Sequence, residues 1–281
     1  MSSELRRDRL QGAAAALAAL WLCWWPVATM TPAMAQSAGF DVGGDSAPIE
    51  IDASEGIEWR RSEKVYIARG NVRASRGSLA LYADTLTARY REAGGQVRIW
   101  QIEAAGDVRL SSDQDTVYGA RAVYDLDKDV VVFDGPGLKL ETPRNRLTAE
   151  DRFEFWTKRN VLVARGGALA VDGERQLRAD SLTGYFRKDD DGRLDLFQIE
   201  AAGHVRISGK GGTASGSKAI YNLDKDVATL SGGVMITKGQ AQLNGDRAEV
   251  DLRTGVSRLL GAAGGGRVRT LIVPGAKPAS P

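Results

Sequence analysis

AVYDLDKDVVVFDGPGLKL occupies residues 122–140, and AIYNLDKDVATLSGGVMI occupies residues 219–236. The shared words Tyr-x-Leu-Asp-Lys-Asp begin at Tyr124 and at Tyr221, 97 residues apart. Each stretch predicts two strands joined by a tight turn, centred on Asp-Lys, because Asp readily accepts hydrogen bonds from nearby backbone amides. The repetition therefore indicates that the chain forms the same β-hairpin at two places, and it does not indicate a catalytic Asp-Lys-Asp site.

The duplication extends well beyond these two hairpins. VYIARGNVRA begins at Val65 and VLVARGGALA at Val161, 96 residues later. WQIEAAGDVRL begins at Trp100 and FQIEAAGHVRI at Phe197, 97 residues later. Most of the chain after residue 48 is therefore a duplicated block, which we expect to form one extended domain over residues 48–274.

A shorter period runs inside each block. Glycines recur at intervals of 29 to 37 residues, a spacing typical of stacked structural units. Around them the apolar residues alternate with polar ones, as in GDVRL and GHVRI, and this period of two predicts strands with one apolar face. We expect an all-β fold in which each glycine makes a turn that closes one apolar run and opens the next: Gly70, Gly106, Gly135, Gly166, Gly203 and Gly232.

The two ends of the chain differ from this block. Arg6, Arg7 and Arg9 precede an uncharged stretch that ends in Ala-Met-Ala, a pattern typical of a secretory signal cleaved after Ala35. An uncleaved membrane anchor is the alternative, because the uncharged stretch is long enough to span a bilayer. Residues 1–35 are thus predicted to be a signal peptide, residues 36–47 a flexible linker and residues 275–281 a disordered tail.

The composition argues against nucleic-acid binding, catalysis and metal binding. The net charge of +2 does not favour a nucleic-acid-binding protein, and the single cysteine, Cys23, lies inside the signal. His204 is the one histidine and is expected to be a solvated strand residue. Glu103 and Glu200 could be imagined as an acid/base pair, but an alternating strand explains both. We therefore predict no catalytic residue, no metal site and no cofactor.

What remains is the apolar face of the strands. These residues are ordinary core if the units close on themselves, and they line an open apolar groove if the sheets splay apart. The sequence pattern leaves both readings open. The residues assigned to this face are Val72, Leu81, Leu86, Val108, Leu110, Val131, Phe133, Leu138, Leu140, Val205, Ile207, Leu230, Val234 and Ile236.

Three stretches carry a resemblance to a known family. PIEIDASEGIEWRRSEKVYIARGNV at residues 48–72, YDLDKDVVVFDG at residues 124–135 and GRVRTLIVPGAK at residues 266–277 occur in the order found in the OstA-like, LptA-type periplasmic proteins of lipopolysaccharide transport. The chain resembles this family from near its first strand to its last. It departs from compact members in carrying the block nearly twice.

The resemblance implies an open antiparallel β-jellyroll, with two twisted sheets in a V, and no enzyme activity. It implies a periplasmic bridge that shields the lipid A acyl chains of lipopolysaccharide in the groove and passes the lipid from the inner to the outer membrane. A charge at Phe133 or Leu230 is then expected to stop lipid binding without unfolding the chain.

The same resemblance implies partners. The edge strands are expected to pair with inner-membrane and outer-membrane proteins of the same transport system, and head-to-tail homo-oligomers are expected to be able to form. The edge residues assigned to this role are Ile49, Ile51, Leu271, Ile272 and Val273.

Three other readings remain open at this point. One is a closed β-solenoid that acts as an envelope scaffold or adhesin without a ligand. Another is a polysaccharide-active enzyme on a β-helix, which would need charged residues on the inner face. The third is an inner-membrane-anchored component of the same transport pathway, if the N-terminal segment is retained.

Overall fold

The computed structural model describes residues 49–112, 114–190, 193–210, 212–251, 256–261 and 269–271. The predicted signal, linker and tail, and the edge residues Ile272 and Val273, lie outside these ranges. Every regular element in the described ranges is a strand. Within them, no helix has the length and apolar character needed to cross a membrane.

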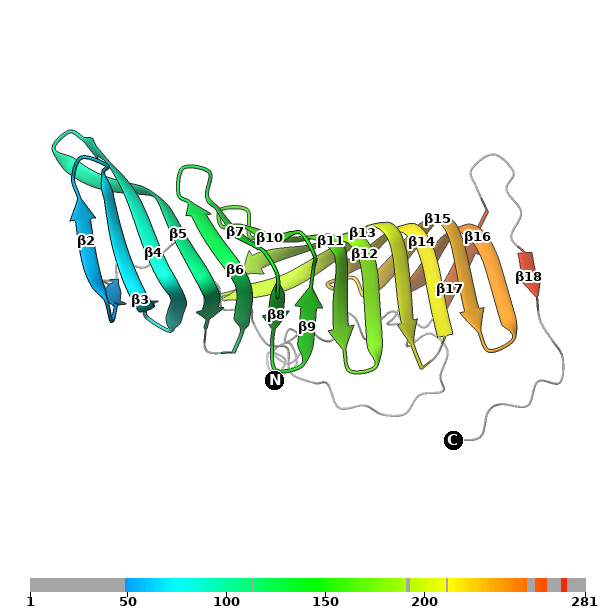
Figure 1. The fold of residues 1–281 in the computed structure, drawn as a ribbon. Helices are drawn as coiled ribbons and strands as arrows, with labels where there is room; N and C mark the ends of the chain where they lie inside the picture. Colours follow the sequence, from blue (N-terminus) through cyan, green and yellow to red (C-terminus); the bar gives the residue numbers. More distant parts are fainter. Residues whose placement is uncertain are drawn as a thin grey trace, which may run out of the picture.

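The strands form one antiparallel sheet of 18 segments (Figure 1). They are β1 (Glu50–Asp52), β2 (Gly56–Arg60), β3 (Val65–Arg76), β4 (Leu79–Ala93), β5 (Gln96–Ser111), β6 (Thr116–Asp125), β7 (Val130–Asp134), β8 (Lys139–Glu141), β9 (Asn145–Thr148), β10 (Arg152–Trp156), β11 (Val161–Asp172), β12 (Arg175–Lys188), β13 (Leu194–Gly209), β14 (Gly212–Asn222), β15 (Val227–Lys238), β16 (Ala241–Asp251), β17 (Val256–Leu260) and β18 (Arg269–Leu271).

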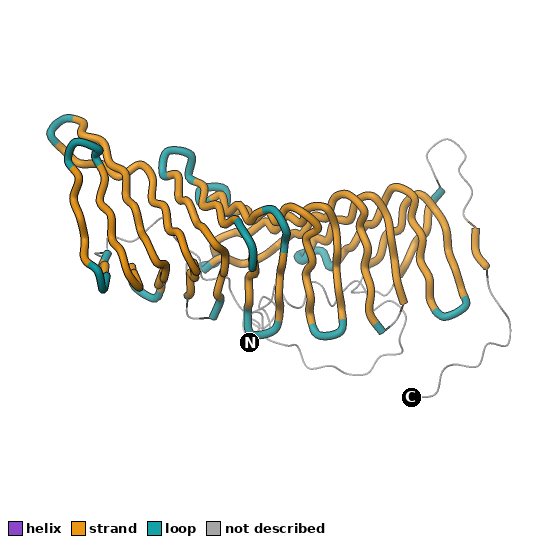
Figure 2. Tube along the Cα trace, in the orientation of Figure 1, coloured by secondary structure: helices purple, strands orange, loops and turns teal. Residues whose placement is uncertain are grey.

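Four pairs of short segments each behave as one interrupted strand. β1 and β2 both pair with β3, and β7 and β8 both pair with β6. In the same way β9 and β10 share β11, and β17 and β18 share β16. The sheet is therefore a meander of fourteen strands, in which each strand pairs with the one before it and the one after it (Figure 2). This antiparallel order confirms the predicted jellyroll-type sheet and differs from a parallel solenoid.

The two predicted hairpins are confirmed. Asp125 pairs with Val130, and Asn222 pairs with Val227, on either side of a four-residue turn. The backbone N–H of Lys128 donates to Asp125 Oδ1 at 3.0 Å, and that of Lys225 donates to Asn222 Oδ1 at 2.9 Å. The residue that caps each turn thus lies just before it, where Asp and Asn are favoured.

The glycines do not have the predicted role. Five of them lie in the middle of long strands, where the pairing register shifts at a β-bulge, and only Gly135 lies in a connection, between β7 and β8. At one such bulge Gly203 and His204 both have positive φ, 77° and 46°, and the chain bends there without ending the strand. The interval of 29 to 37 residues therefore measures two bent strands, because every second strand carries the bulge.

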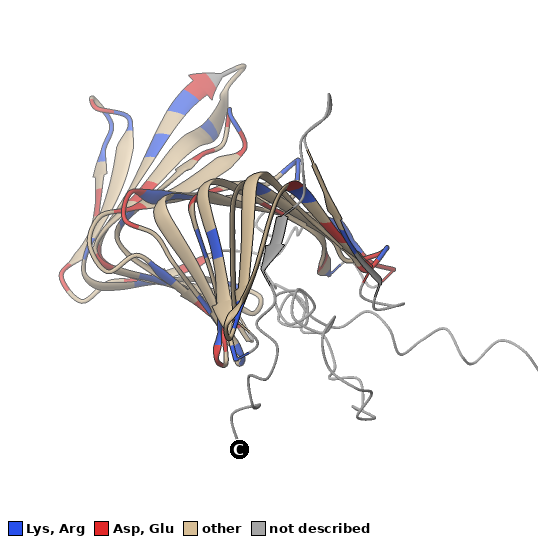
Figure 3. Cartoon of the chain, turned by 90° about the vertical axis from the view of Figure 1, so that its right-hand side faces the viewer, with Lys and Arg blue, Asp and Glu red and all other residues tan. Residues whose placement is uncertain are grey.

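These bends divide every long strand into two limbs, which Figure 3 shows from the end of the row of strands. We call upper limb the half that ends in the turns near residues 61–64 and 126–129, and lower limb the half that ends in the turns near residues 142–144 and 173–174. Because side chains alternate across a sheet, one face of both limbs points into the angle between them. The two predicted sheets are therefore the two limbs of one continuous, bent sheet.

Candidate functional site

The inner face of the upper limb carries an unbroken apolar row. Each member is the register partner of the next, so the row crosses all fourteen strands without a polar residue. At about 4.8 Å per strand it is roughly 60 Å long. This upper row consists of Ile57, Ala68, Leu86, Ala104, Ala122, Phe133, Phe153, Ala164, Leu182, Ala201, Ala219, Leu230, Ala248 and Leu259.

The inner face of the lower limb carries a matching row. It also crosses all fourteen strands, and only its last member is polar. This lower row consists of Ile51, Ala74, Leu81, Leu110, Val117, Leu140, Leu147, Ala170, Leu177, Ile207, Ala214, Ile236, Leu243 and Thr270.

The bend between the two rows is closely packed. Val72, Val108, Val205 and Val234 each follow a bulge and are only 1% exposed. Their partners on the next strand are small, Ala83 opposite Val72 and glycine opposite the other three. Large and small side chains thus alternate along the bend, which lets the two limbs approach each other.

All fourteen residues assigned to the apolar face belong to one hydrophobic cluster. Ten of them are buried, and the four that are half-buried all lie on the lower row: Leu81, Leu110, Leu140 and Ile236. The face is therefore a core near the bend and an accessible surface farther out, so each of the two readings holds for a part of it. A ligand could contact the outer part without displacing the packed core.

Phe133 and Leu230, the two positions at which a charge was expected to stop lipid binding without unfolding the chain, are both buried. Phe133 and Leu230 are only 5% and 6% exposed. An uncompensated charge at such a depth destabilises the fold itself, because the carboxylate loses its water. The expectation that these substitutions would spare folding is therefore wrong, and half-buried positions such as Leu147 on the lower row are the informative ones.

A further row lies on the inner face of the upper limb, one pair of residues closer to the turns, and sequence reasoning had identified only Val131 of it. Its aromatic members are spaced too far apart in sequence to be seen as one surface, and only the register joins them. This second upper row includes Trp59, Tyr66, Ile102, Tyr124, Phe155, Leu162, Ile199 and Tyr221.

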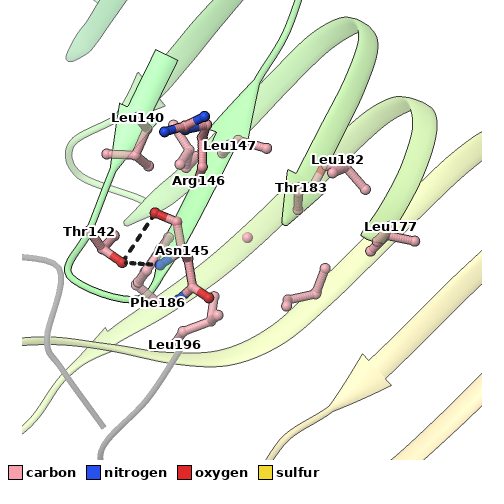
Figure 4. Close-up of a pocket in the computed structure, with 14 residues that line it drawn as sticks. Leu140, Thr142, Asn145, Arg146, Leu147, Leu177, Leu182, Thr183, Phe186 and Leu196 are labelled. Atoms are coloured by element: carbon pink, nitrogen blue, oxygen red, sulfur yellow. Dashed lines mark hydrogen bonds between the residues drawn. The ribbon is translucent and has the colours of Figure 1, made fainter. Parts of the chain in front are cut away.

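A cavity of about 120 Å³ lies between the limbs near the middle of the chain (Figure 4). Leu140 and Leu147 line it from the lower limb, and Leu162, Phe186 and Leu196 line it from the upper limb. Polar residues line it at Thr142, Asn145 and Arg146, in and after the β8–β9 turn, and at Thr183 on the upper limb. The cavity is thus an apolar space with a polar border, a shape that suits an acyl chain with a polar end.

The outer face is charged, in contrast to the inner one. Glu154 accepts hydrogen bonds from Arg152 and Arg165, at 2.6 and 2.9 Å. Burial raises the pKa of Glu154, but these two guanidinium groups outweigh burial and hold the pKa below its ordinary value. Hydrogen bonds from Arg121 and Arg89 likewise lower the pKa of Glu103. The outer face is therefore a set of satisfied ion pairs.

Glu103 and Glu200 do not form an acid/base pair. They lie on the same outer row but six strands apart, about 29 Å at the usual strand spacing. Glu200 instead approaches Lys218 Nζ at 3.4 Å. His204 is exposed, and its Nδ1 lies 2.9 Å from Asp180 Oδ2. In the described part of the chain, no group of three or more His, Cys, Asp or Glu side chains could hold a metal ion.

The repeated Asp-Lys-Asp motif also ties neighbouring hairpins together. Arg187, near the tip of the β12–β13 hairpin, donates to both carboxylate oxygens of Asp224 at 2.6 and 2.7 Å. In the first copy of the repeat, Arg91 donates to Asp127 Oδ2. These bonds connect the longest hairpins to the next turn of the sheet, which explains why the first Asp of each Asp-Lys-Asp is repeated.

The first edge of the sheet exposes apolar residues. β1 and β2 pair only with β3 among the described strands, so one side of their backbone has no strand partner. Ile49 is 53% exposed and Ile57 is 57% exposed, and Ile51 and Trp59 are also exposed. At the other edge, Leu271 lies in β18, which pairs only with β16 among the described strands. An unpaired strand with apolar side chains is a template for pairing with another chain.

Comparison with known proteins agrees with this geometry. The family model described as "LptA/(LptD N-terminal domain) LPS transport protein" matches residues 50–151 and again residues 147–256. The two matched segments begin 97 residues apart, which is the offset of the duplication. No curated protein matches the chain.

Among solved structures, the chain is similar to LptH of Pseudomonas aeruginosa, described as the LptA homologous periplasmic component of the conserved lipopolysaccharide transport device. The identity is 17% and the TM-score is 0.39, over 46% of this chain and 95% of LptH. The family model, in contrast, covers most of the chain and both copies of the repeat. The chain therefore belongs to the LptA/LptD N-terminal domain family of lipopolysaccharide transport proteins.

Proposed function

We propose that this chain is a periplasmic bridge that binds lipopolysaccharide, shields its lipid A acyl chains between the two limbs, and passes it from the inner to the outer membrane. The observation that carries the proposal is the pair of apolar rows that face each other across all fourteen strands.

The rows suit transport as well as binding. Burial of apolar surface stabilises a bound acyl chain by about 25 cal/mol per Å², or about 0.8 kcal/mol per methylene, without any fixed direction. A shift of the lipid by one strand exchanges one set of apolar contacts for an equivalent set. Because the accessible lower row contains no polar residue before its last member, Thr270, the acyl chains can move along it without crossing a polar barrier.

The two ends of the sheet supply the contacts that a bridge needs. We assign β1 and β2 at one edge, and β18 with the residues that follow it at the other edge, to pairing with inner-membrane and outer-membrane proteins of the same transport system. Backbone hydrogen bonds would give the affinity, and the exposed Ile51 and Ile57 would add apolar contact. The same two edges would allow head-to-tail association of copies of the chain.

We assign no catalytic step to the chain. Its periplasmic location is inferred from the signal pattern of residues 1–35, and cleavage after Ala35 would release a chain that begins at Gln36. A chain that retained residues 1–35 would instead act as an anchored component of the same pathway.

Native mass spectrometry of the protein purified from its own envelope tests this proposal. We expect a mass that includes lipopolysaccharide or lipid A, loss of that mass on delipidation, and its return when lipopolysaccharide is added back. An apo mass with no uptake of added lipopolysaccharide would contradict the carrier function and favour a scaffold without a ligand. The same spectrum reports whether the chain begins at Gln36.

A further inference from the structure

A polar strip borders the lower row of the inner face. Side chains two positions beyond a member of that row point to the same side of the sheet, because the strand period is two. On β3, β9 and β11 these positions hold Arg76, Asn145 and Asp172, next to Ala74, Leu147 and Ala170. Asn145 and Asp172 are register partners, so the strip is continuous between their strands.

Two atoms of this strip lack a partner inside the protein. Among the described residues, Asn145 Oδ1 and Arg76 Nε are the buried side-chain polar atoms without a hydrogen bond. Such atoms are rare in folded proteins because the lost contact with water is not replaced. Both atoms lie on the same border of the inner face, although polar side chains also occur on the outer face and in the turns.

Asn145 is placed to meet a ligand. It lines the cavity between the limbs, where Figure 4 shows it close to Phe186 and Leu196. Its own turn is held by its backbone, since the N–H of Asn145 donates to Thr142 Oγ1 at 3.0 Å and its carbonyl accepts from the backbone N–H of Thr142 at 2.9 Å. The side-chain amide therefore has no structural task in the turn.

The corresponding positions of the repeat lack this arrangement. The residue 96 positions before Asn145 is Ile49, and the residue 96 positions after it is Ala241. In the first copy, Trp59, Tyr66 and Tyr90 stand where the second copy has Phe155, Leu162 and Phe186. Their rings pack with centroids 5.5 and 5.2 Å apart, and Trp59 Nε1 donates to Tyr90 Oη at 2.8 Å. At these positions the first copy thus packs three aromatic rings against one another, whereas the second copy keeps a cavity lined by an unpaired acceptor.

We infer that the cavity of the second copy is an anchoring position for one acyl chain, and that Asn145 Oδ1 accepts a hydrogen bond from an amide N–H at the polar end of that chain. This inference rests on the proposed lipid-binding function and adds the chemical class of the ligand, an N-acylated amphiphile. It also gives the ligand an orientation. The polar end lies at the tips of the lower limb, and the acyl chain extends inward toward Leu162 and Leu196.

A matched pair of lipids isolates this hydrogen bond. N-tetradecanoylglucosamine carries the amide N–H, and its N-methyl amide derivative lacks it. Both are titrated below their micellar concentrations by displacement of a fluorescent acyl probe. We expect the full chain to bind the N–H lipid about three-fold to ten-fold more tightly than the N-methyl lipid, the range of one hydrogen bond. In Asn145→Leu this ratio is expected to fall to about one.

The control is Gln176→Leu, an amide-to-aliphatic change at the same end of the lower limb but on the exposed outer face, where we expect the ratio to stay unchanged. Because the backbone holds the 142–145 turn, Asn145→Leu should keep or raise the melting temperature. Should it fail to fold, Asn145→Ala, the residue found at position 241, replaces it with the same expected ratio.

The outcomes separate the two proposals. If the unaltered protein binds both lipids and the ratio survives in the Asn145 variant, the hydrogen bond is refuted and lipid binding stands. If the unaltered protein binds neither lipid, both the anchoring position and the proposed function are overturned.

Discussion

Leu147→Asp is the sharpest perturbation of the proposed groove. Leu147 lies on the lower row, lines the cavity between the limbs and is half-buried. It is therefore accessible to an acyl chain, yet it is not one of the fully buried residues that hold the two limbs together. Its neighbour on β9, Thr148, points to the opposite face and offers a matched control.

The expected loss of affinity follows from burial. Complete burial of a leucine is worth about 2 kcal/mol, so a bound acyl chain that covers the exposed half of Leu147 gains about 1 kcal/mol from it. In the variant, the same chain would cover a carboxylate, which costs at least about 2 kcal/mol in lost hydration. The sum of about 3 kcal/mol corresponds to roughly 100-fold weaker binding. The apo protein loses only about 1 kcal/mol of stability, or a few degrees in melting temperature.

Binding is measured with lipid A by displacement of a fluorescent acyl probe, and folding is checked by circular dichroism and thermal melting. Thr148→Asp places the same charge one residue away, opposite Lys139, and is expected to bind within two-fold of the unaltered protein. A folded Leu147→Asp protein that binds lipid A within three-fold of the unaltered chain would refute the assignment of this face to the acyl chains.

Three further predictions concern the bends, the outer face and the edge. Gly203→Val should lower stability by at least about 2 kcal/mol in chemical denaturation, because φ there is +77° and a Cβ would meet Asp180; an unchanged midpoint would contradict the bulge geometry. Arginines hold the pKa values of Glu103 and Glu154 below 4.5, so their stabilisation should be present above pH 4.5 and disappear as the pH falls through the lowered values. Replacing both by Gln should flatten this acid limb of the stability curve, and an unaltered limb would exclude them as its source. Ile57→Lys, at an exposed edge position, should weaken association with membrane partners or other copies in analytical ultracentrifugation without changing the melting temperature; unchanged association would argue against pairing at this edge.

Much of the fold could be predicted because it depends on local patterns. The period of two revealed which residues share a face, and all fourteen assigned to the apolar face lie in one cluster. The duplicated hairpins at residues 122–140 and 219–236 were confirmed, because a turn between two strands is encoded by the few residues around it. The antiparallel order follows from short connections that leave no room for a crossover.

The cavity could not be predicted, because its walls come from segments far apart in the chain. Leu140 and Leu147 meet Leu196 only after the sheet has bent, and no spacing in the sequence relates these residues. Asn145 was missed for the same reason. A single polar residue next to a turn is unremarkable until the opposite limb covers it.

The sequence by itself determined that this chain is a duplicated, antiparallel β protein with one apolar and one charged face, since strand period, turn chemistry and internal repetition are all local properties. Only the tertiary structure decided what the glycines do. A glycine that ends a strand and one that bends it look alike in sequence, because both need a positive φ. The register of the neighbouring strands continues past Gly203, so the strand bends there, and that bend turns an apolar face into an enclosed groove.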